Sequence, residues 1–338
     1  MNIPLSLKWL SVMRLSIVIA SILSSLLLAP ASHADEAKAR KPLSSKKMGL
    51  TIRVEGEGWG RADREEIETV LYSAADELLD RLPAKLTAPI VVTHVEGNPV
   101  TEFGKGPEGE YLVHLSAKDR RWSQFVYQFA HELCHIMSNY EANVSVENTT
   151  KYNQWFEETL CETASLYTLK SMAVTWENSA PYPNWKGYAP ALSDYAEQFA
   201  REEHRHLPSG TTLADWLREN EDKLRNDPYL RDKNEVVANL LLPLFEKNPE
   251  EWAALHYLNL DPADARDSLK QYLQHWYGNA PAEHKKFILD ILALLGVEGI
   301  DLAPIQVAAG EAARAETVAV AVPRAQAGPH GPATEWKK

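Results

Sequence analysis

The sequence predicts an α+β fold, in which a small N-terminal α/β layer with an edge strand precedes a mostly helical region. Short apolar runs over 50–54, 89–94 and 110–115 predict strands, and the segment 62–82 between the first two has helical spacing. After Trp122 the spacing of apolar residues becomes helical almost throughout. It predicts helices over 122–139, 154–173, 191–206, 212–225, 233–247, 264–277 and 282–296.

The composition excludes several classes of protein. The chain has 338 residues, is 45% hydrophobic and contains ten Trp, which is enough apolar surface for a sizeable core. Its net charge is -12 and it has no long Lys/Arg run, so we expect no nucleic acid partner. Two cysteines are too few for a disulfide scaffold or a Cys-rich zinc module.

The N-terminus has the pattern of a secretory signal peptide. Lys8 and Arg14 precede an uncharged run over 15–28, and the small residues of 29–34 suit a cleavage site. The run is short for a membrane span, which needs about 20 residues. We therefore predict a cleaved signal peptide over 1–34 and an exported, periplasmic or secreted protein without stable membrane insertion. The alternative is an uncleaved anchor.

The segment 125–137 contains the pattern H-E-x-x-H with helical apolar spacing. His131 and His135 are four residues apart, so both imidazoles lie on one helix face and reach one Zn²⁺. Glu132 is about 100° round the helix from His131, where it addresses metal-bound water rather than the metal. The two histidines are therefore candidate zinc ligands, and Glu132 is a candidate catalytic base.

A second acidic helix follows, with Glu158 placed 23 residues after His135 and Glu162 one turn further on. Together the two segments resemble the gluzincin metallopeptidases, the group of thermolysin and the membrane alanyl aminopeptidases. The resemblance implies a zincin-like fold, Glu158 as third zinc ligand, and Glu162 as the carboxylate that hydrogen-bonds a ligand histidine. Glu157 remains open as a substitute ligand, and Glu141 as the third ligand of a metzincin-like site.

The function implied by this resemblance is an exported zinc metallopeptidase with one Zn²⁺ per chain. Its substrate is a peptide or protein, and zinc-activated water hydrolyses the peptide bond with Glu132 as general base. Tyr229, which follows Pro228 ahead of a predicted helix, is a candidate stabiliser of the oxyanion. The alternatives for that role are His204, His206 and His256.

Two alternative functions remain open from the sequence. One is a catalytically inactive, peptidase-like zinc-binding protein that acts as a binding or interaction module. The other is a helical interaction module without a metal. The strand over 110–115 favours the peptidase, because it resembles the edge strand on which these enzymes bind an extended peptide.

The two cysteines fall on the two zinc helices. Cys134 lies inside H-E-x-x-H, and Cys161 is three residues after Glu158. In an oxidising compartment a disulfide could join the helices, whereas two buried free thiols are equally compatible with the sequence.

The predicted organisation of the chain has five parts. A signal peptide over 1–34 and a flexible leader over 35–48 precede a zincin-like catalytic core over 49–173, which contains both zinc helices. A helical C-terminal subdomain follows over 174–302, and a disordered Ala/Pro-rich tail occupies 303–338. The helical subdomain begins with a loop rich in aromatic residues, for which we favour self-packing over a role at the substrate.

Overall fold

The computed structural model describes residues 49–80, 82, 86–140 and 151–301. The predicted signal peptide, the leader over 35–48 and the tail over 303–338 lie outside the described residues. The described part contains both a sheet and many helices, which confirms the α+β class. None of its helices is long and apolar enough to span a membrane.

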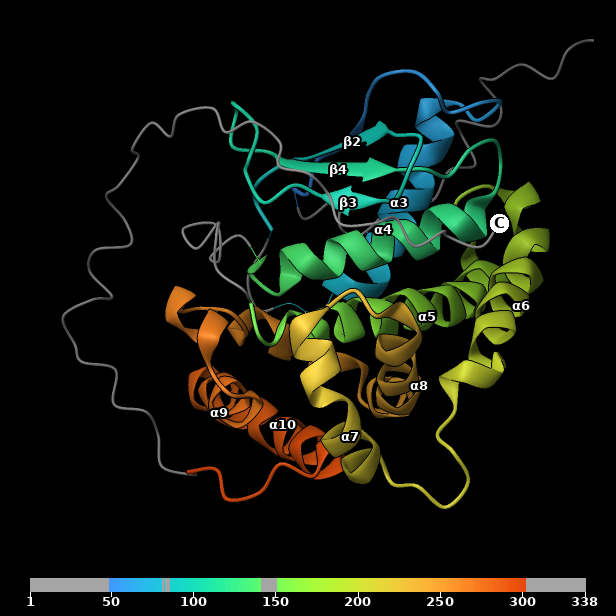
Figure 1. Cartoon of the computed structure of the whole chain (residues 1–338). Coiled ribbons are helices and arrows are strands. Elements are labelled where there is room, and N and C mark those ends of the chain that lie inside the picture. The colour runs from blue at the N-terminus through green and yellow to red at the C-terminus, as the bar shows by residue number, and fades with distance from the viewer. Residues whose placement is uncertain (1–48, 81, 83–85, 141–150, 302–338) are drawn as a thin grey trace, which may run out of the picture. The chain divides into compact units, whose positions relative to one another are not determined.

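The sheet has four strands in the order β1-β2-β4-β3 (Figure 1). Strands β1 (Ile52–Val54), β2 (Ile90–His94) and β4 (Tyr111–Leu115) run parallel. Strand β3 (Val100–Thr101) is antiparallel to β4, with Val100 opposite His114. The strand expected over 110–115 is therefore an internal strand and not the edge strand. The edge beside it is β3, which is too short to produce an alternating pattern.

Helix α3 (Arg64–Leu79) is fastened to the first strand of the sheet. It begins at a capping box, in which Asp63 and Glu66 satisfy free backbone N–H groups at the helix start. The hydroxyl of Tyr72 accepts a hydrogen bond from Ile52 N at 2.8 Å and donates one to Leu50 O at 3.3 Å. These bonds fix the helix against β1.

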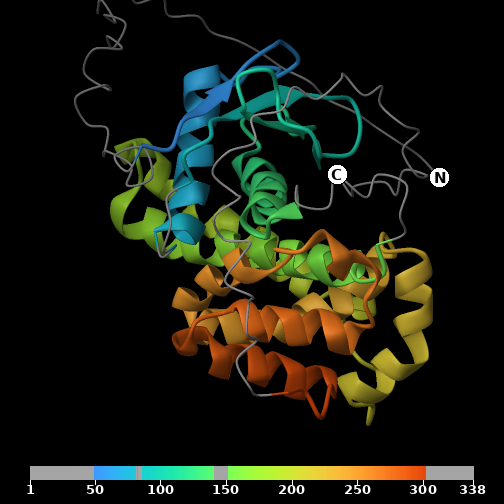
Figure 2. The ribbon, with the colours of Figure 1, turned by 90° about the vertical axis from the view of Figure 1, so that its left-hand side faces the viewer.

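Helices α4 (Trp122–Met137) and α5 (Gln154–Ser179) form the centre of the molecule. Helix α4 packs between the sheet and α5, as Figures 1 and 2 both show. Helix α4 ends where Asn139 adopts a positive φ of 56°. The side chain of Asn139 donates to the carbonyl oxygens of His256 at 2.8 Å and Leu258 at 2.9 Å, which ties the helix end to the C-terminal part.

The remaining helices cover the other side of α5. The α-helices are α6 (Ala189–Ala200), α7 (Leu213–Asn226), α8 (Arg231–Lys247), α9 (Leu269–Asn279) and α10 (Ala282–Leu295). Short 3₁₀ helices lie at Pro183–Tyr188, Glu203–Arg205, Pro249–Tyr257 and Pro262–Arg266. Because α5 is surrounded, it carries buried residues on all its faces, including Trp155 and Trp176.

Several predicted helix limits are wrong. Helix α5 continues to Ser179, so the first residues of the expected aromatic loop are helical. Helix α6 stops at Ala200, because a separate 3₁₀ turn follows. Helix α9 begins only at Leu269, after Ser268 forms a capping box with Gln271.

The aromatic residues of this region pack against each other, as we expected. Trp185 stacks on Trp176 with ring centroids 5.3 Å apart, and it lies equally close to Trp122 at the start of α4. Tyr182 contacts Trp185 edge-on at 4.7 Å. These rings therefore join the helices to one another, and their role is in the core.

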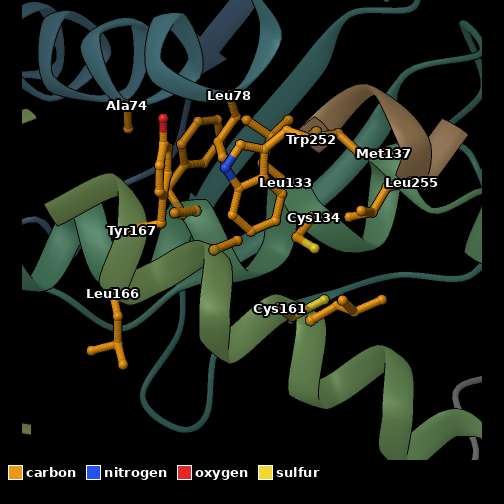
Figure 3. Close-up of a cluster of buried hydrophobic side chains, with 14 of the residues drawn as sticks. Ala74, Leu78, Leu133, Cys134, Met137, Cys161, Leu166, Tyr167, Trp252 and Leu255 are labelled. Carbon is orange, nitrogen blue, oxygen red and sulfur yellow. The ribbon is translucent and has the colours of Figure 1, made fainter. Parts of the chain in front are cut away.

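A buried hydrophobic cluster lies between α4, α5 and the 3₁₀ helix at Pro249–Tyr257 (Figure 3). Leu133 and Met137 reach it from α4, Tyr167 from α5, and Trp252 and Leu255 from the 3₁₀ helix at Pro249–Tyr257. The cluster fixes the spacing of α4 and α5, and thus of the polar side chains on their other faces.

Candidate metal centre

Helix α4 presents its two histidines side by side. The imidazole rings of His131 and His135 are 5.2 Å apart and nearly perpendicular. One face of the helix carries Phe125, Phe129 and Leu133, all fully buried in the hydrophobic core. The helical period therefore brings the two histidines together as the sequence predicted.

Glu158 reaches both histidines from the first turns of α5. Its Oε2 lies 3.3 Å from Nε2 of His131, and its Oε1 lies 3.7 Å from Nε2 of His135. Only 11–12% of each of these three side chains is exposed. Three donor groups thus converge from two helices in a site with little access to water.

Glu157 holds the opposite side of the His135 ring. Its Oε1 lies 2.7 Å from Nδ1 of His135, while its Oε2 accepts a hydrogen bond from Asn259 Nδ2 at 3.0 Å. Asn259 also donates to Ser138 O at 2.9 Å and accepts from the Tyr272 hydroxyl at 2.8 Å. Glu157 therefore contacts the ring nitrogen that faces away from Glu158, and it orients a ligand histidine.

Glu162 is bonded to a different set of partners. It accepts hydrogen bonds from the Tyr127 hydroxyl at 2.5 Å and from Arg205 Nη1 at 2.8 Å, and Arg231 Nη2 lies at 3.5 Å. Burial acts to raise the pKa of Glu162, but the two guanidinium groups outweigh it and lower the pKa to about 2. The charge of His131 acts in the same direction. A hydrogen bond from one of the two histidines to the carboxylate of Glu162 stays a prediction.

Glu132 is held by the edge strand. Only 2% of the residue is exposed, and its Oε2 accepts a hydrogen bond from Thr101 Oγ1 at 2.8 Å. The same hydroxyl lies 3.2 Å from the backbone oxygen of Glu132. Thr101 belongs to β3, so the sheet edge positions the carboxylate next to the converging ligands. Sequence reasoning did not identify Thr101, since nothing near it in the chain marks the contact.

The electrostatics of the site favour a cation. Burial lowers the pKa of His135, but the carboxylates of Glu158 and Glu157 outweigh it and raise the pKa to about 10. Burial likewise raises the pKa of Glu158, but the neighbouring histidines bring it below its usual range. The carboxylates thus stabilise positive charge between the two helices.

The donor set fits zinc. Two imidazoles and one carboxylate are the ligands of many catalytic zinc sites, and they leave a coordination position open. Cys161 is a further donor here, because its sulfur and ligand nitrogens of His131 and His135 lie within 4.8 Å of one another. Burial and the adjacent Cys134 raise the pKa of the Cys161 thiol well above its usual range. Glu141, the alternative third ligand, lies outside the described residues.

The two cysteines face each other between α4 and α5 (Figure 3). Both are buried and free in the structure. Of the two alternatives left by the sequence, the structure thus has the pair of thiols and not the disulfide between Cys134 and Cys161.

Tyr229 lies at the same end of α5 as the metal ligands. Its hydroxyl is 3.1 Å from Nε2 of Gln154, and that amide is 3.4 Å from Oε1 of Glu158. Burial of the phenol, together with the charges of Glu158 and Glu157, raises the pKa of Tyr229. The residue as a whole is 53% exposed.

The alternative histidines are placed differently. His204 pairs with Glu235, and His256 contacts Tyr257 with ring centroids 5.8 Å apart. His206 ends the 3₁₀ turn at Glu203–Arg205. No contact described for these three residues reaches His131, His135 or Glu158, whereas Tyr229 is linked to Glu158 through Gln154.

Two other groups of side chains in the described part of the chain have metal-ligand spacing. They are Glu202, His204 and Glu235, and Asp264, Asp267 and His275. In the first, Arg205 and Arg231 lie 2.8 Å and 2.6 Å from Glu235, and they supply the positive charge that a metal would bring. In the second, His275 already pairs with Asp264 at 2.5 Å and is 41% exposed. The site on α4 and α5 is therefore the better metal centre.

Comparison with known proteins adds no family assignment. No protein-family model, curated protein or solved structure matches the chain.

Proposed function

We propose that this protein is an exported, zinc-dependent metallopeptidase with a zincin-like catalytic core. One observation carries the proposal: the carboxylate of Glu158 lies 3.3 Å and 3.7 Å from the Nε2 atoms of His131 and His135. These residues come from two helices and converge in the arrangement that the H-E-x-x-H pattern and the acidic helix imply. The exported location rests on the sequence pattern of 1–34.

His131, His135 and Glu158 would hold one Zn²⁺. When bound, Zn²⁺ polarises a carbonyl group and lowers the pKa of water towards about 7. The carboxylate of Glu132 accepts a proton from the attacking water and delivers it to the leaving amine. Because the Thr101 hydroxyl is bonded to Oε2, we assign the proton transfer to Oε1 of Glu132.

Tyr229 is the proposed stabiliser of the oxyanion. The phenol is protonated at neutral pH, so the hydroxyl can donate a hydrogen bond to a developing negative charge. The hydrogen bond with Gln154 holds the phenol on the side of the site where Glu158 lies. The exposed position of Tyr229 leaves room for it to reach a bound substrate.

A peptide or protein is the substrate class that the neighbouring sheet edge favours. Within the described residues, strand β3 pairs with β4 on one side only, and the hydroxyl of its Thr101 contacts Glu132. An extended peptide can add to such an edge through its main chain, which binds it with little sequence preference. Its scissile bond would then lie beside the metal ligands.

The proposal is tested with the protein, its Glu132→Gln variant and a Glu177→Gln variant as matched control, since Glu177 is exposed on α5. Each is assayed for zinc content and for cleavage of a peptide library by mass spectrometry. We expect zinc in all three, cleavage by the wild type and the control, and a loss of at least about a hundredfold in the Glu132→Gln variant. Equal cleavage by Glu132→Gln would exclude the proposed base.

A second candidate function is favoured by Cys161. If its sulfur completes a four-ligand site with His131, His135 and Glu158, zinc is enclosed and the protein is a peptidase-like binding module without activity. Cobalt substitution separates the two functions. A sulfur-to-cobalt charge-transfer band that disappears in Cys161→Ala supports the closed site, and its absence supports the open, catalytic one.

A further inference from the structure

A chain of ring contacts leads from the metal centre to a lysine at its rim. The ring of His135 is 6.1 Å from that of Tyr140, and Tyr140 is 5.6 Å from Phe103. The ammonium nitrogen of Lys151 lies 3.8 Å from the centre of the Phe103 ring. Lys151 and Phe103 come from different parts of the fold, because Phe103 follows β3 whereas Lys151 precedes α5.

Both residues are fixed in this position. The Tyr140 hydroxyl donates to the backbone oxygen of Glu102, which holds the segment next to Phe103 against the end of α4. The backbone oxygen of Lys151 accepts a hydrogen bond from Gln154 N at 3.3 Å, within the first turn that leads to Glu158. The backbone of Lys151 is thus fixed at the start of α5.

The environment of Lys151 is suited to an anionic ligand. Burial lowers the pKa of Lys151, although the negative charges of Glu157 and Glu158 oppose this shift. Those two carboxylates are already engaged with His135 and His131. Within the described residues, the contact recorded for the Lys151 ammonium is the ring of Phe103. A partly buried cation gains further stabilisation from an anion that pairs with it directly.

Phe103 offers an apolar surface next to this charge. Phe103 is 42% exposed, and Lys151 and Tyr140 contact its ring. A carboxylate attached to a short hydrocarbon chain matches both residues, because its charge suits the Lys151 ammonium and its carbons suit the Phe103 ring. Thr101 of β3 contacts the proposed catalytic carboxylate, and Phe103 lies two residues further along the chain.

We propose that Lys151 and Phe103 form a subsite for a peptide carboxylate, supplied either by the C-terminus of the substrate or by an acidic side chain. The ammonium of Lys151 pairs with the carboxylate, and the Phe103 ring contacts the adjoining aliphatic carbons. This inference rests on the proposed function, because it names the substrate class of the same site. It makes Lys151 a specificity-determining residue.

Binding is measured by calorimetry on the zinc-loaded Glu132→Gln protein, so that turnover is not required. The ligands are N-acetylated peptides of neutral sequence. Two of them differ only at the C-terminus, which is a free acid in one and an amide in the other. In a further series, the amidated peptide carries glutamate or glutamine at each position in turn. We expect the free acid or one glutamate peptide to bind at least about tenfold more tightly than its neutral partner. Tighter binding of the free acid indicates that the subsite takes the C-terminus, and tighter binding of a glutamate peptide indicates that it takes an acidic side chain.

Substitutions assign this preference to Lys151. Lys151→Met should abolish the tenfold preference, and Lys151→Arg should retain most of it. Lys285→Met is the matched control, because Lys285 also lies over a ring, 4.6 Å from that of Tyr277, but far along the chain on α10. It should leave the preference unchanged.

Three results would overturn the inference: no binding of any peptide, equal binding of acidic and neutral peptides, or a preference that survives in Lys151→Met. Failure of the proposed function is recognised separately, since cleavage of the library by the wild-type protein does not require a carboxylate preference. A peptidase without that preference contradicts the subsite alone.

Discussion

Thr101 Oγ1 donates a hydrogen bond to Oε2 of Glu132 at 2.8 Å, and this bond joins the edge strand of the sheet to the H-E-x-x-H helix. It places a residue of β3 next to the proposed catalytic base and restricts the orientation of a buried carboxylate. The strand along which we expect the substrate to bind is therefore the same strand that orients the base.

Removal of this hydroxyl should slow the reaction without emptying the metal site. We expect Thr101→Val to lower kcat by about tenfold or more, because Glu132 loses the bond that orients it, while zinc content stays unchanged. Steady-state kinetics and elemental analysis measure the two effects. Thr211→Val, at a position on a loop before α7, is the control. A kcat equal to that of the wild type would show that Thr101 does not position the base.

Loss of Glu157 should weaken zinc binding. Its carboxylate holds Nδ1 of His135 at 2.7 Å, and removal of such a partner typically costs 10- to 100-fold in metal affinity, about the range we expect for Glu157→Ala. Asn259→Ala should act in the same direction but more weakly, because Asn259 contacts the carboxylate and not the histidine. Competition with a chelator measures the affinity. Unchanged zinc affinity in Glu157→Ala would contradict the assigned role.

The buried ion pair of Glu162 predicts an acid-dependent loss of stability. The pKa of Glu162 is lowered to about 2 in the folded protein, from an ordinary value of 4.5, so its contribution is present above pH 4.5 and is lost as the pH falls through 2. Glu162→Gln should remove this pH dependence from the unfolding free energy.

The same variant should also be less stable at neutral pH. Glu162→Gln leaves the fully buried Arg205 with a weaker partner, and breaking a buried pair typically costs about 3–5 kcal/mol. Denaturant unfolding between pH 2 and pH 7 measures both effects. A variant with the stability and pH profile of the wild type would contradict the ion pair.

The cysteines should behave as two protected thiols. Cys134 and Cys161 are free and buried, so a thiol reagent should label neither in the folded protein and both after unfolding. Mass spectrometry of the labelled protein counts the reactive groups. A protein that takes up label only after reduction would contain the disulfide instead.

Local sequence patterns predicted much of the fold. The strands β2 and β4 and the helix α4 lie within two residues of their expected limits, because each is long enough to show a clear period. The two-residue strand β3 has no such pattern, and its absence from the prediction led to the wrong choice of edge strand. At the start of the expected aromatic loop, the apolar pattern likewise did not show that α5 continues to Ser179.

Only part of the candidate site could be predicted from the sequence. Helical periodicity places His131 and His135 together, and the resemblance to gluzincins indicates Glu158. Asn259 and Thr101 reach the site from distant parts of the chain, and their contacts depend on how the helices and the sheet pack. A single sequence contains no local signal for such contacts.

The most direct test of the metal centre is a crystal structure of the zinc-loaded protein with anomalous diffraction measured at the zinc absorption edge. We predict one anomalous peak per chain, at about 2.0–2.2 Å from the nearest atoms of His131, His135 and Glu158. Zinc bound by other residues, or no zinc peak from a protein that folds normally in its presence, would contradict the account.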